Sequence, residues 1–310
     1  MEYTNQRLAF GNTLVALGKE NKDIVVLDAD LCGSTMGKLF EQAYPDRHFE
    51  MGIAEANMLS VSAGLAQTGK IPFANSFAVF TTGRAYDQIR QTIAIGKLNV
   101  KVIGSSAGLS DFGDGATHQS VEDIAIMQAI PNMVVICPAD ANEAVNATKA
   151  ITDYHGPVYM RVNRNDYENI TSPDQPFVIG EPTVMKEGKD IVIFATGYMV
   201  GVSLKAAKSL ENQISVKVVN VSTIKPLNDE KIQALAGDCK AVITAEEHSI
   251  VGGLGSAIAG ALSKSCKPIE RIGLNDTFGC SAHNYQELLE YYELTEGRVA
   301  KAIEEMNRTF

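Results

Sequence analysis

One carboxylate of the chain stands in an apolar setting that could support chemistry. Glu55 lies in the segment GIAEANM and begins a predicted helix rich in Ala, Met and Leu. A carboxylate at the start of a helix is favoured by the helix dipole and by capping, so its position alone has a structural explanation. A carboxylate among apolar residues can also handle protons at a functional site. Phe73, Phe77 and Phe80 follow within a short stretch, and taken separately they indicate a hydrophobic core.

A loop with an aspartate and a histidine offers a second kind of chemistry. The tripeptide GDG around Asp114, together with Asn142 downstream, has the oxygen donors that a magnesium ion prefers. The same tripeptide is common in turns, because glycine tolerates tight turns and Asp bonds its own backbone. The loop continues as ATHQ and brings His118 near the aspartate. We therefore interpret it as a loop that handles substrate, and we predict no metal site in this chain.

Hydrophobic periodicity places these residues on an α/β framework. Short β-branched runs alternate with helical segments, which predicts parallel sheets with helices on both faces. The alternation of predicted strands and helices stops between Asn163 and Met185, in a Pro-containing stretch typical of a linker, and resumes after it. We predict two consecutive α/β domains with largely parallel sheets, at residues 1–165 and 186–310, joined by a linker at 166–185. The predicted helices are 7–19, 55–67, 82–98, 120–129, 141–152, 201–210, 229–235, one after Gly253 and others through Met306, and the predicted strands are 23–28, 100–104, 133–137, 158–162, 190–195, 216–221, 241–245 and 269–272.

Length and composition set the broad class. The chain has 310 residues, enough for two domains that each bury a core. A formal net charge of −10 without a basic cluster disfavours nucleic acid as a partner. No segment approaches the ~20 apolar residues of a membrane span, and residues 1–12 lack the apolar core of a signal peptide. Five scattered cysteines without a CxxC pair fit a reducing compartment, so we expect a cytoplasmic protein without a membrane partner.

Several segments, taken in order, resemble the transketolase family. MGIAEANM, NSFAVFTTGRAYDQIR and DGATHQSVEDIAIMQAIPNM, followed by PAD, resemble its pyrimidine-binding domain, and TIKPLN and TAEEHSIVGGLGSAIA resemble its C-terminal domain. The likeness covers essentially the whole chain, whereas the family's diphosphate-binding domain is missing from it. The chain therefore resembles the small, C-terminal subunit of a split transketolase, which requires a separately encoded N-terminal subunit.

The resemblance implies roles at the cofactor, thiamine diphosphate. Glu55 matches the catalytic glutamate that binds N1′ of the aminopyrimidine, where a charge-assisted hydrogen bond favours the tautomer that accepts the thiazolium C2 proton. Phe80 matches the aromatic ring that stacks on the aminopyrimidine, and Phe77 matches its apolar neighbour. Asp30 matches an acidic residue near the cofactor. The accompanying Mg²⁺ or Ca²⁺ is expected to have its ligands on the partner subunit.

The resemblance also implies roles toward the sugar. Asp114 matches a residue that accepts a hydrogen bond from the donor's C2 hydroxyl. His118 matches one that contacts the hydroxyls of the two-carbon unit, where an imidazole can also transfer protons. The positions that match the sugar-phosphate site are Arg7, Ser34 and Arg164.

Two positions depart from many full-length members of the family. Ser106 stands where those members have a histidine that touches substrate phosphate, and Gly83 stands where they have a further aromatic residue near the pyrimidine. These departures leave the detail of the phosphate site and the preferred acceptor open.

The implied activity is transfer of a two-carbon ketol unit from xylulose 5-phosphate to ribose 5-phosphate or erythrose 4-phosphate in an α2β2 assembly. The alternatives are the C-terminal half of a 1-deoxyxylulose-5-phosphate synthase, the β subunit of a 2-oxoacid dehydrogenase and a non-catalytic regulatory subunit. The segment VEDIAIMQAIPNM favours transketolase over the synthase, which also carries a DG-x-THQ loop. The joint presence of Glu55, Phe80, Asp114 and His118 disfavours a non-catalytic chain.

Overall fold

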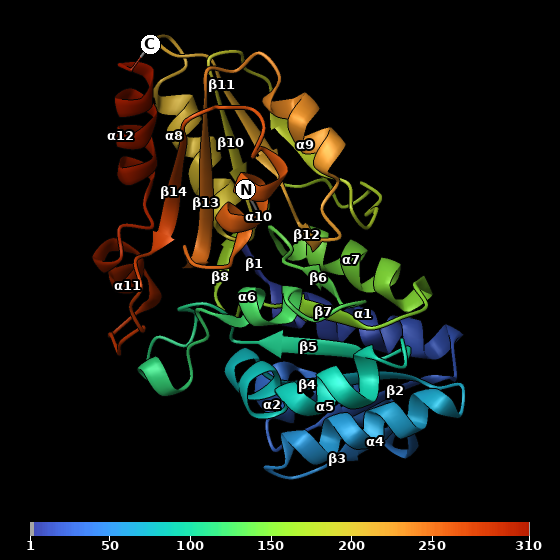
Figure 1. Ribbon diagram of the computed structural model, residues 1–310. Coiled ribbons are helices and arrows are strands. Elements are labelled where there is room, and N and C mark those ends of the chain that lie inside the picture. Colours follow the sequence, from blue (N-terminus) through green and yellow to red (C-terminus); the bar gives the residue numbers. More distant parts are fainter. Residues whose placement is uncertain (1–2, 310) are drawn as a thin grey trace.

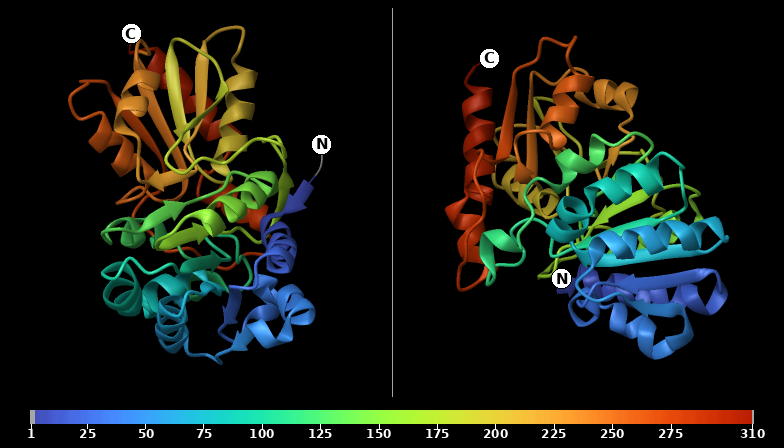
Figure 2. Two further views of the ribbon diagram at one scale, coloured as in Figure 1. Left: turned by 90° about the vertical axis from the view of Figure 1, so that its right-hand side faces the viewer. Right: turned by 60° about the horizontal axis from the view of Figure 1, so that its bottom comes forward.

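The computed structural model describes residues 3–309 and contains two α/β units stacked end to end, with the N-terminal half below and the C-terminal half above in Figure 1. Figure 2 shows the same stacking from two further directions, with the last part of the N-terminal half next to the C-terminal half. The prediction of two consecutive α/β domains with largely parallel sheets is confirmed.

The larger sheet carries the candidate site. Within residues 3–309 its strands lie in the order β12 (Thr223–Lys225), β6 (Val134–Ile136), β7 (Val158–Arg161), β5 (Lys101–Ser105), β4 (Ile71–Phe77), β2 (Ile24–Asp28) and β3 (His48–Glu50). Neighbouring strands are parallel except for β12, which runs antiparallel to β6. Because parallel strands end at the same edge of a sheet, the segments that follow β2, β3, β4 and β5 meet there.

Alternating residues along each strand bury two faces of this sheet. Ile24 and Val26 pack on one face, and Val25 and Leu27 pack on the other. The first face is covered by α1 (Gln6–Glu20), α3 (Gly37–Ala43) and α7 (Ala141–Asp153), and the second by α4 (Glu55–Gln67), α6 (Asp123–Gln128) and the helical stretch around α5 (Tyr86–Gln88). Burial on both faces explains why the strands read as continuous apolar runs.

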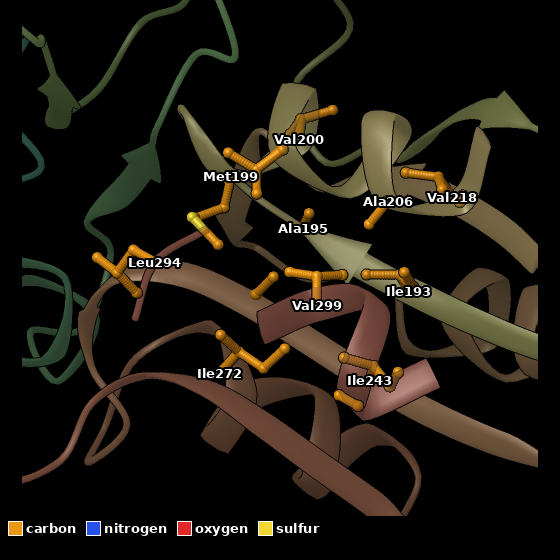
Figure 3. Packing of buried hydrophobic residues seen from close by; sticks show 14 of the residues in the cluster. Ile193, Ala195, Met199, Val200, Ala206, Val218, Ile243, Ile272, Leu294 and Val299 are labelled. Atoms are coloured by element: carbon orange, nitrogen blue, oxygen red, sulfur yellow. The ribbon is translucent and has the colours of Figure 1, made fainter. Parts of the chain in front are cut away.

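The sheet of the C-terminal half is built in the same way. In the described part of the chain its strand order is β14 (Ile269–Leu274), β13 (Ala241–Ser249), β10 (Ile191–Ala195), β11 (Val216–Asn220) and β9 (Thr183–Lys186), with β9 antiparallel to β11. One face packs on α8 (Met199–Ser209), α11 (Tyr285–Tyr291) and α12 (Glu296–Asn307), and the other on α9 (Asp229–Ala236) and α10 (Leu254–Ala261). Figure 3 shows the first of these cores, where Ile193 of β10 and Ile243 of β13 lie close to Val299 of α12.

Several predicted elements differ from the observed ones. The helix predicted at 82–98 winds from Phe80 to Ala94 and is partly π-helical, at Phe80–Arg84 and Ile89–Ala94. The helix predicted at 120–129 begins later, at Asp123. Strand β4 was not predicted, because Pro72 and the polar residues near its end interrupt the apolar run. Helix α4 begins at Glu55 and ends at Gln67, as predicted.

The two halves are interlocked. Strand β8 (Asp166–Glu168) lies in the predicted linker and pairs with β1 (Tyr3–Asn5), while β12 from the C-terminal half completes the edge of the first sheet. The division at residues 165 and 185 stays a prediction. Across residues 3–309, every helix is too short or too polar to cross a bilayer.

A buried ionic network, called here the seam, lies where the halves meet and consists of Asp123, Tyr159, Arg161 and Glu247. Arg161 donates from Nε and Nη2 to the Asp123 carboxylate at 2.8 and 3.1 Å, and the Tyr159 hydroxyl donates to it at 2.6 Å. Arg161 also donates to the backbone carbonyl of Glu247 on β13 at 2.9 Å. Burial opposes ionisation of Asp123, but the charge of Arg161 prevails and holds the pKa of Asp123 below its usual value.

Candidate active site

A hollow of about 220 Å³ lies at the carboxyl edge of the first sheet. Its walls come from the segments that follow β2, β3, β4 and β5, and its lining residues are Ala29, Asp30, Leu31, Ile53, Glu55, Phe80, Arg84 and His118. Ligand pockets usually enclose roughly 300–1,000 Å³. The hollow is therefore large enough for only part of a cofactor-sized ligand.

Glu55 is the buried acid of this hollow. It is the first residue of α4, where the helix dipole favours a carboxylate, and its side chain is 2% exposed. Arg84 donates from Nη1 to both carboxylate oxygens at 2.9 and 2.8 Å. The Arg84 side chain is 51% exposed, and its guanidinium carbon lies 4.9 Å from the centroid of the Phe80 ring. The buried carboxylate thus faces a solvent-exposed cation above an aromatic ring.

Three aromatic rings cluster at the site, and two of them, Phe80 and His118, line the hollow. Phe77 and Phe80 lie nearly parallel, with centroids 6.0 Å apart and an interplanar angle of 13°. The His118 ring meets both edge-on, at 6.2 Å from Phe77 and 5.3 Å from Phe80. Phe77 is buried and Phe80 is half-buried, so Phe80 presents the accessible aromatic surface.

One arginine lies next to these rings, and a second arginine lies near the first. The Arg164 guanidinium carbon is 6.0 Å from the Phe77 centroid, and its Nη1 donates to Asp111 at 2.6 Å. Arg7 donates from Nη1 to the carbonyl of Ser34 at 2.9 Å, while its buried Nε has no hydrogen-bond partner among residues 3–309. Burial and then the charge of Arg164 lower the pKa of Arg7, so the two cations are close enough to repel each other. An anion placed between them would relieve that repulsion.

The remaining predicted site residues lie at the margin. Asp30 is exposed, has a φ of 58° and donates its backbone N–H to Glu50 at 2.7 Å. Asp114 is exposed ahead of a short 3-10 turn, Gly115–Thr117, in the loop that carries His118, and it is not part of the lining of the hollow. The structure thus brings Glu55, the two phenylalanines, His118 and Asp30 together, places the arginines beside them and leaves Asp114 further out.

The two family departures occupy different environments. Ser106 is buried at the end of β5 with a φ of 52°, and its hydroxyl has no hydrogen-bond partner within the described residues. Gly83 is exposed, and a side chain there would enter open space.

Two polar residues of the site were missed in the sequence. Arg84 follows Phe80 by four residues, a spacing at which helical side chains share a face, so the pairing was available as a signal. Asp111 contacts Arg164 from a loop 53 residues away, and no local pattern indicates that contact.

The described residues hold no group of three His, Cys, Asp or Glu side chains placed to bind a metal ion. Asn142, the other half of the weighed magnesium motif, lies in α7 and donates to the carbonyl of Thr171. Location of the metal ligands on a partner subunit stays a prediction.

Comparison with known proteins identifies the family. Residues 3–169 match the family "Transketolase, pyrimidine binding domain", and residues 180–299 match "Transketolase, C-terminal domain". The chain is 46% identical to a putative transketolase C-terminal section from Methanocaldococcus jannaschii, across 99% of this chain and 98% of that protein. It is 40% identical to the 6-deoxy-6-sulfo-D-fructose transketolase subunit SqwH from Clostridium sp., across 97% and 94% of the two chains.

A solved structure agrees with these relatives. A split-gene transketolase described as an inactive β4 tetramer superposes with a TM-score of 0.89 at 44% identity, covering 99% of each chain. The chain therefore belongs to the transketolase family. Within it, the chain corresponds to the C-terminal section of a split transketolase, as predicted.

Proposed function

We propose that this chain supplies the pyrimidine-binding side of a thiamine-diphosphate-dependent ketol transferase. It acts with an N-terminal subunit and moves a two-carbon unit from a ketose phosphate, such as xylulose 5-phosphate, to an aldose phosphate. The observation that carries the proposal is the hollow in which the buried Glu55 carboxylate lies beside the accessible Phe80 ring.

These residues fit the aminopyrimidine of the cofactor. Phe80 offers a face for a flat heteroaromatic ring, and Glu55 offers a carboxylate to a ring nitrogen once Arg84 moves aside. When bound, thiamine diphosphate supplies the carbon nucleophile and the electron sink for carbon–carbon cleavage. The small volume of the hollow leaves the rest of the cofactor, and its metal ion, to the partner subunit.

The side chains of this chain then divide the work. Glu55 holds a proton at the ring nitrogen, and His118, which forms the wall next to Phe80, accepts or returns protons at the sugar hydroxyls. Asp114 and Asp30 lie at the open side, where Asp114 accepts a hydrogen bond from a hydroxyl of the sugar. Arg7 and Arg164, with the adjacent Ser34, bind the anionic end of the sugar.

The relatives support a divided enzyme. The similar solved chain forms a β4 tetramer that is described as inactive, which agrees with a subunit that needs a complement. We propose an α2β2 assembly, in which the N-terminal subunit covers the open side of the hollow.

One relative acts on a sulfonated sugar, which adds a second kind of candidate donor substrate. SqwH is a subunit of a transketolase for 6-deoxy-6-sulfo-D-fructose, a sugar with a sulfonate at its end. Two arginines beside the hollow suit either a phosphate or a sulfonate, since both are multi-oxygen anions. The donor panel should therefore include both kinds of sugar.

The deciding experiment combines this chain with its N-terminal partner, thiamine diphosphate and Mg²⁺. Ketol transfer from xylulose 5-phosphate to ribose 5-phosphate is measured for the pair and for each chain alone. We expect activity from the pair only.

A pair that assembles and binds the cofactor by calorimetry, but transfers no ketol unit from any donor in the panel, would refute the proposal. Pyruvate with glyceraldehyde 3-phosphate would then test the 1-deoxyxylulose-5-phosphate synthase alternative.

A further inference from the structure

The loop from Ala107 to Ser120, called here the His118 loop, is attached to the C-terminal half at three points. Leu109 donates its backbone N–H to Glu247 Oε1 at 2.7 Å. The backbone N–H of Ala282 donates to the carbonyl of Phe112 at 2.8 Å. Gln119 donates from Nε2 to the carbonyl of Cys280 at 2.9 Å. The loop belongs to the first unit, but its anchors lie on β13 and on the segment before α11, to which it extends in Figure 1.

Glu247 is the one side-chain carboxylate among these anchors. It is 4% exposed, and its second oxygen lies 3.4 Å from the Asn163 amide nitrogen. The Tyr285 hydroxyl, which accepts from the same amide nitrogen at 3.1 Å, is also hydrogen-bonded to the carboxylate. A carboxylate hydrogen-bonded to residues from three separate segments of the chain holds one orientation, so Leu109 is held in place with it.

The packing at Gly108 confirms how closely the loop approaches this carboxylate. A Cβ added to Gly108 would lie 2.4 Å from Glu247 Oε1, and the residue has a φ of 65°. Only glycine satisfies both conditions without displacement of the carboxylate or the loop.

The anchored loop carries two of the residues assigned to the sugar, Asp114 and His118. Asp111, two residues after Leu109, pairs with Arg164, and the Gln119 amide that reaches Cys280 also donates to the carbonyl of Asp111 at 3.1 Å. His118 precedes Gln119 and meets the Phe80 ring edge-on. A shift of the loop at Leu109 would therefore move Asp111 and His118 relative to the hollow.

We propose that Glu247 is a positioning residue for sugar binding. From the C-terminal half, it holds the His118 loop in a fixed position relative to the hollow around Glu55. The inference rests on the proposed function for its kinetic consequence, but not for the anchoring itself. It also assigns a task to the C-terminal half, whose residues do not line the hollow.

The neighbouring glutamate provides a matched control. Glu246 is also buried, but its carboxylate accepts from the backbone N–H groups of Leu254 and Gly255 at 2.6 and 2.8 Å. Those contacts lie wholly within the C-terminal half, at the start of α10. Loss of Glu246 should reduce stability without releasing the His118 loop.

The first measurement is hydrogen exchange of the full chain, which needs neither cofactor nor substrate. In Glu247→Ala, amides of residues 107–120 should exchange about tenfold faster, because an anchoring hydrogen bond is lost. Glu246→Ala should leave them near the wild-type rate, and Glu247→Gln should restore protection, because its amide oxygen still accepts from Leu109. Equal loop exchange in Glu247→Ala and Glu246→Ala would overturn the inference.

The second measurement is steady-state kinetics of the assembled holoenzyme. Glu247→Ala should raise KM for the ketose donor about tenfold while cofactor affinity stays unchanged, because Glu55 and Phe80 lie outside the loop. Glu246→Ala should leave that KM unchanged, and an unchanged KM in Glu247→Ala would overturn the inference.

A second variant and the order of the two measurements separate failure of this inference from failure of the proposed function. If Glu247→Ala does not fold, Gly108→Ala breaks the same contact from the loop side and should give the same exchange and KM changes. If the wild-type pair transfers no ketol unit, the proposed function fails, while the exchange comparison still decides whether Glu247 anchors the loop.

Discussion

The hollow around Glu55 and the seam around Arg161 both pair an arginine with a carboxylate, but they differ in burial. In the seam, the Arg161 side chain is 4% exposed and Asp123 is fully buried, and both are held by several hydrogen bonds. In the hollow, Glu55 is equally buried, but its partner Arg84 is half exposed and bonds only through Nη1 in the described structure.

The difference distinguishes scaffold from site. A fully buried pair held by several hydrogen bonds offers little to a ligand, and it holds the two halves in one arrangement. A buried acid covered by a half-exposed cation can exchange that cation for another donor at little cost. The hollow therefore has the properties of an incomplete binding site, whereas the seam has those of a structural joint.

The largest expected effect is on catalysis by the hollow. Glu55→Gln should lower ketol transfer by the assembled enzyme by about 10²–10⁴-fold, the range for loss of a positioned proton-handling group. Steady-state assays measure it, with the exposed Glu187→Gln as the control. Near-normal activity in Glu55→Gln would remove Glu55 from the mechanism.

The next effect is on the stability of the seam. Arg161→Met leaves the Asp123 carboxylate buried without its cation and should lower the free energy of unfolding by about 3–5 kcal/mol. Urea denaturation of the full chain measures this change. Lys70→Met, which breaks the exposed pair with Asp23, should leave the midpoint nearly unchanged. Similar midpoints for both variants would contradict the assignment of the seam as a joint.

A smaller effect is expected on cofactor binding by the aromatic wall. Phe80→Ala should weaken binding of thiamine diphosphate to the assembled enzyme about tenfold, because the accessible ring surface is lost. Calorimetry in the presence of Mg²⁺ measures the affinity. Tyr291→Ala, which removes an exposed aromatic ring from α11, should have no effect, and an equal loss in both variants would exclude a specific stack.

Removal of Arg84, the exposed cation of the hollow, is expected to strengthen cofactor binding, whereas the Phe80 variant weakens it. Arg84→Gln should bind thiamine diphosphate about two- to fivefold more tightly, because the cofactor no longer competes with an ion pair that is exposed on one side. The same titration measures it, with Arg90→Gln as an exposed control from the same helical stretch. Weaker binding in Arg84→Gln would mean that Arg84 contacts the cofactor instead of yielding to it.

The smallest effect is a pH dependence from two adjacent buried acids, Glu247 of the seam and its neighbour Glu246. Burial raises the pKa of both Glu246 and Glu247 to about 7, from the ordinary value of 4.5. A raised native pKa stabilises the fold below pH 4.5, and this contribution is lost as pH rises toward and through 7.

Burial also lowers the pKa of His248 to about 4, which adds stability as pH rises from 4 to 6.5 and so opposes this trend. Comparison with a variant that keeps His248 removes the contribution of this histidine from the difference in unfolding free energy. Relative to the Glu246→Gln/Glu247→Gln double variant, the wild type should lose unfolding free energy between pH 5 and pH 8, measured by denaturation at each pH. A constant difference would show that neither carboxyl titrates in this range.

Much of the framework was readable in the sequence. The β-branched runs of β2 and β10 and the full extent of α4 follow from periodicity, because continuous apolar runs and helical spacing are local properties. Strand β4, interrupted by Pro72 near its start and Asn75 toward its end, has no such local signal, and its membership of the sheet depends on pairing with β2 and β5.

The site divides in the same way. Glu55, Phe80 and His118 were identified from ordered motifs, and their meeting at one edge follows from the rule that parallel strands end together. By itself the sequence therefore determined the alternation of strands and helices, the family likeness and the chemical types at the site.

Only the tertiary structure decided which groups face one another. The pairs Arg84–Glu55, Arg164–Asp111 and Glu247–Leu109 join residues 29, 53 and 138 positions apart. Such contacts depend on how two sheets stack and where loops cross between them. Local propensity does not encode that geometry, because it arises from the burial of whole faces against each other.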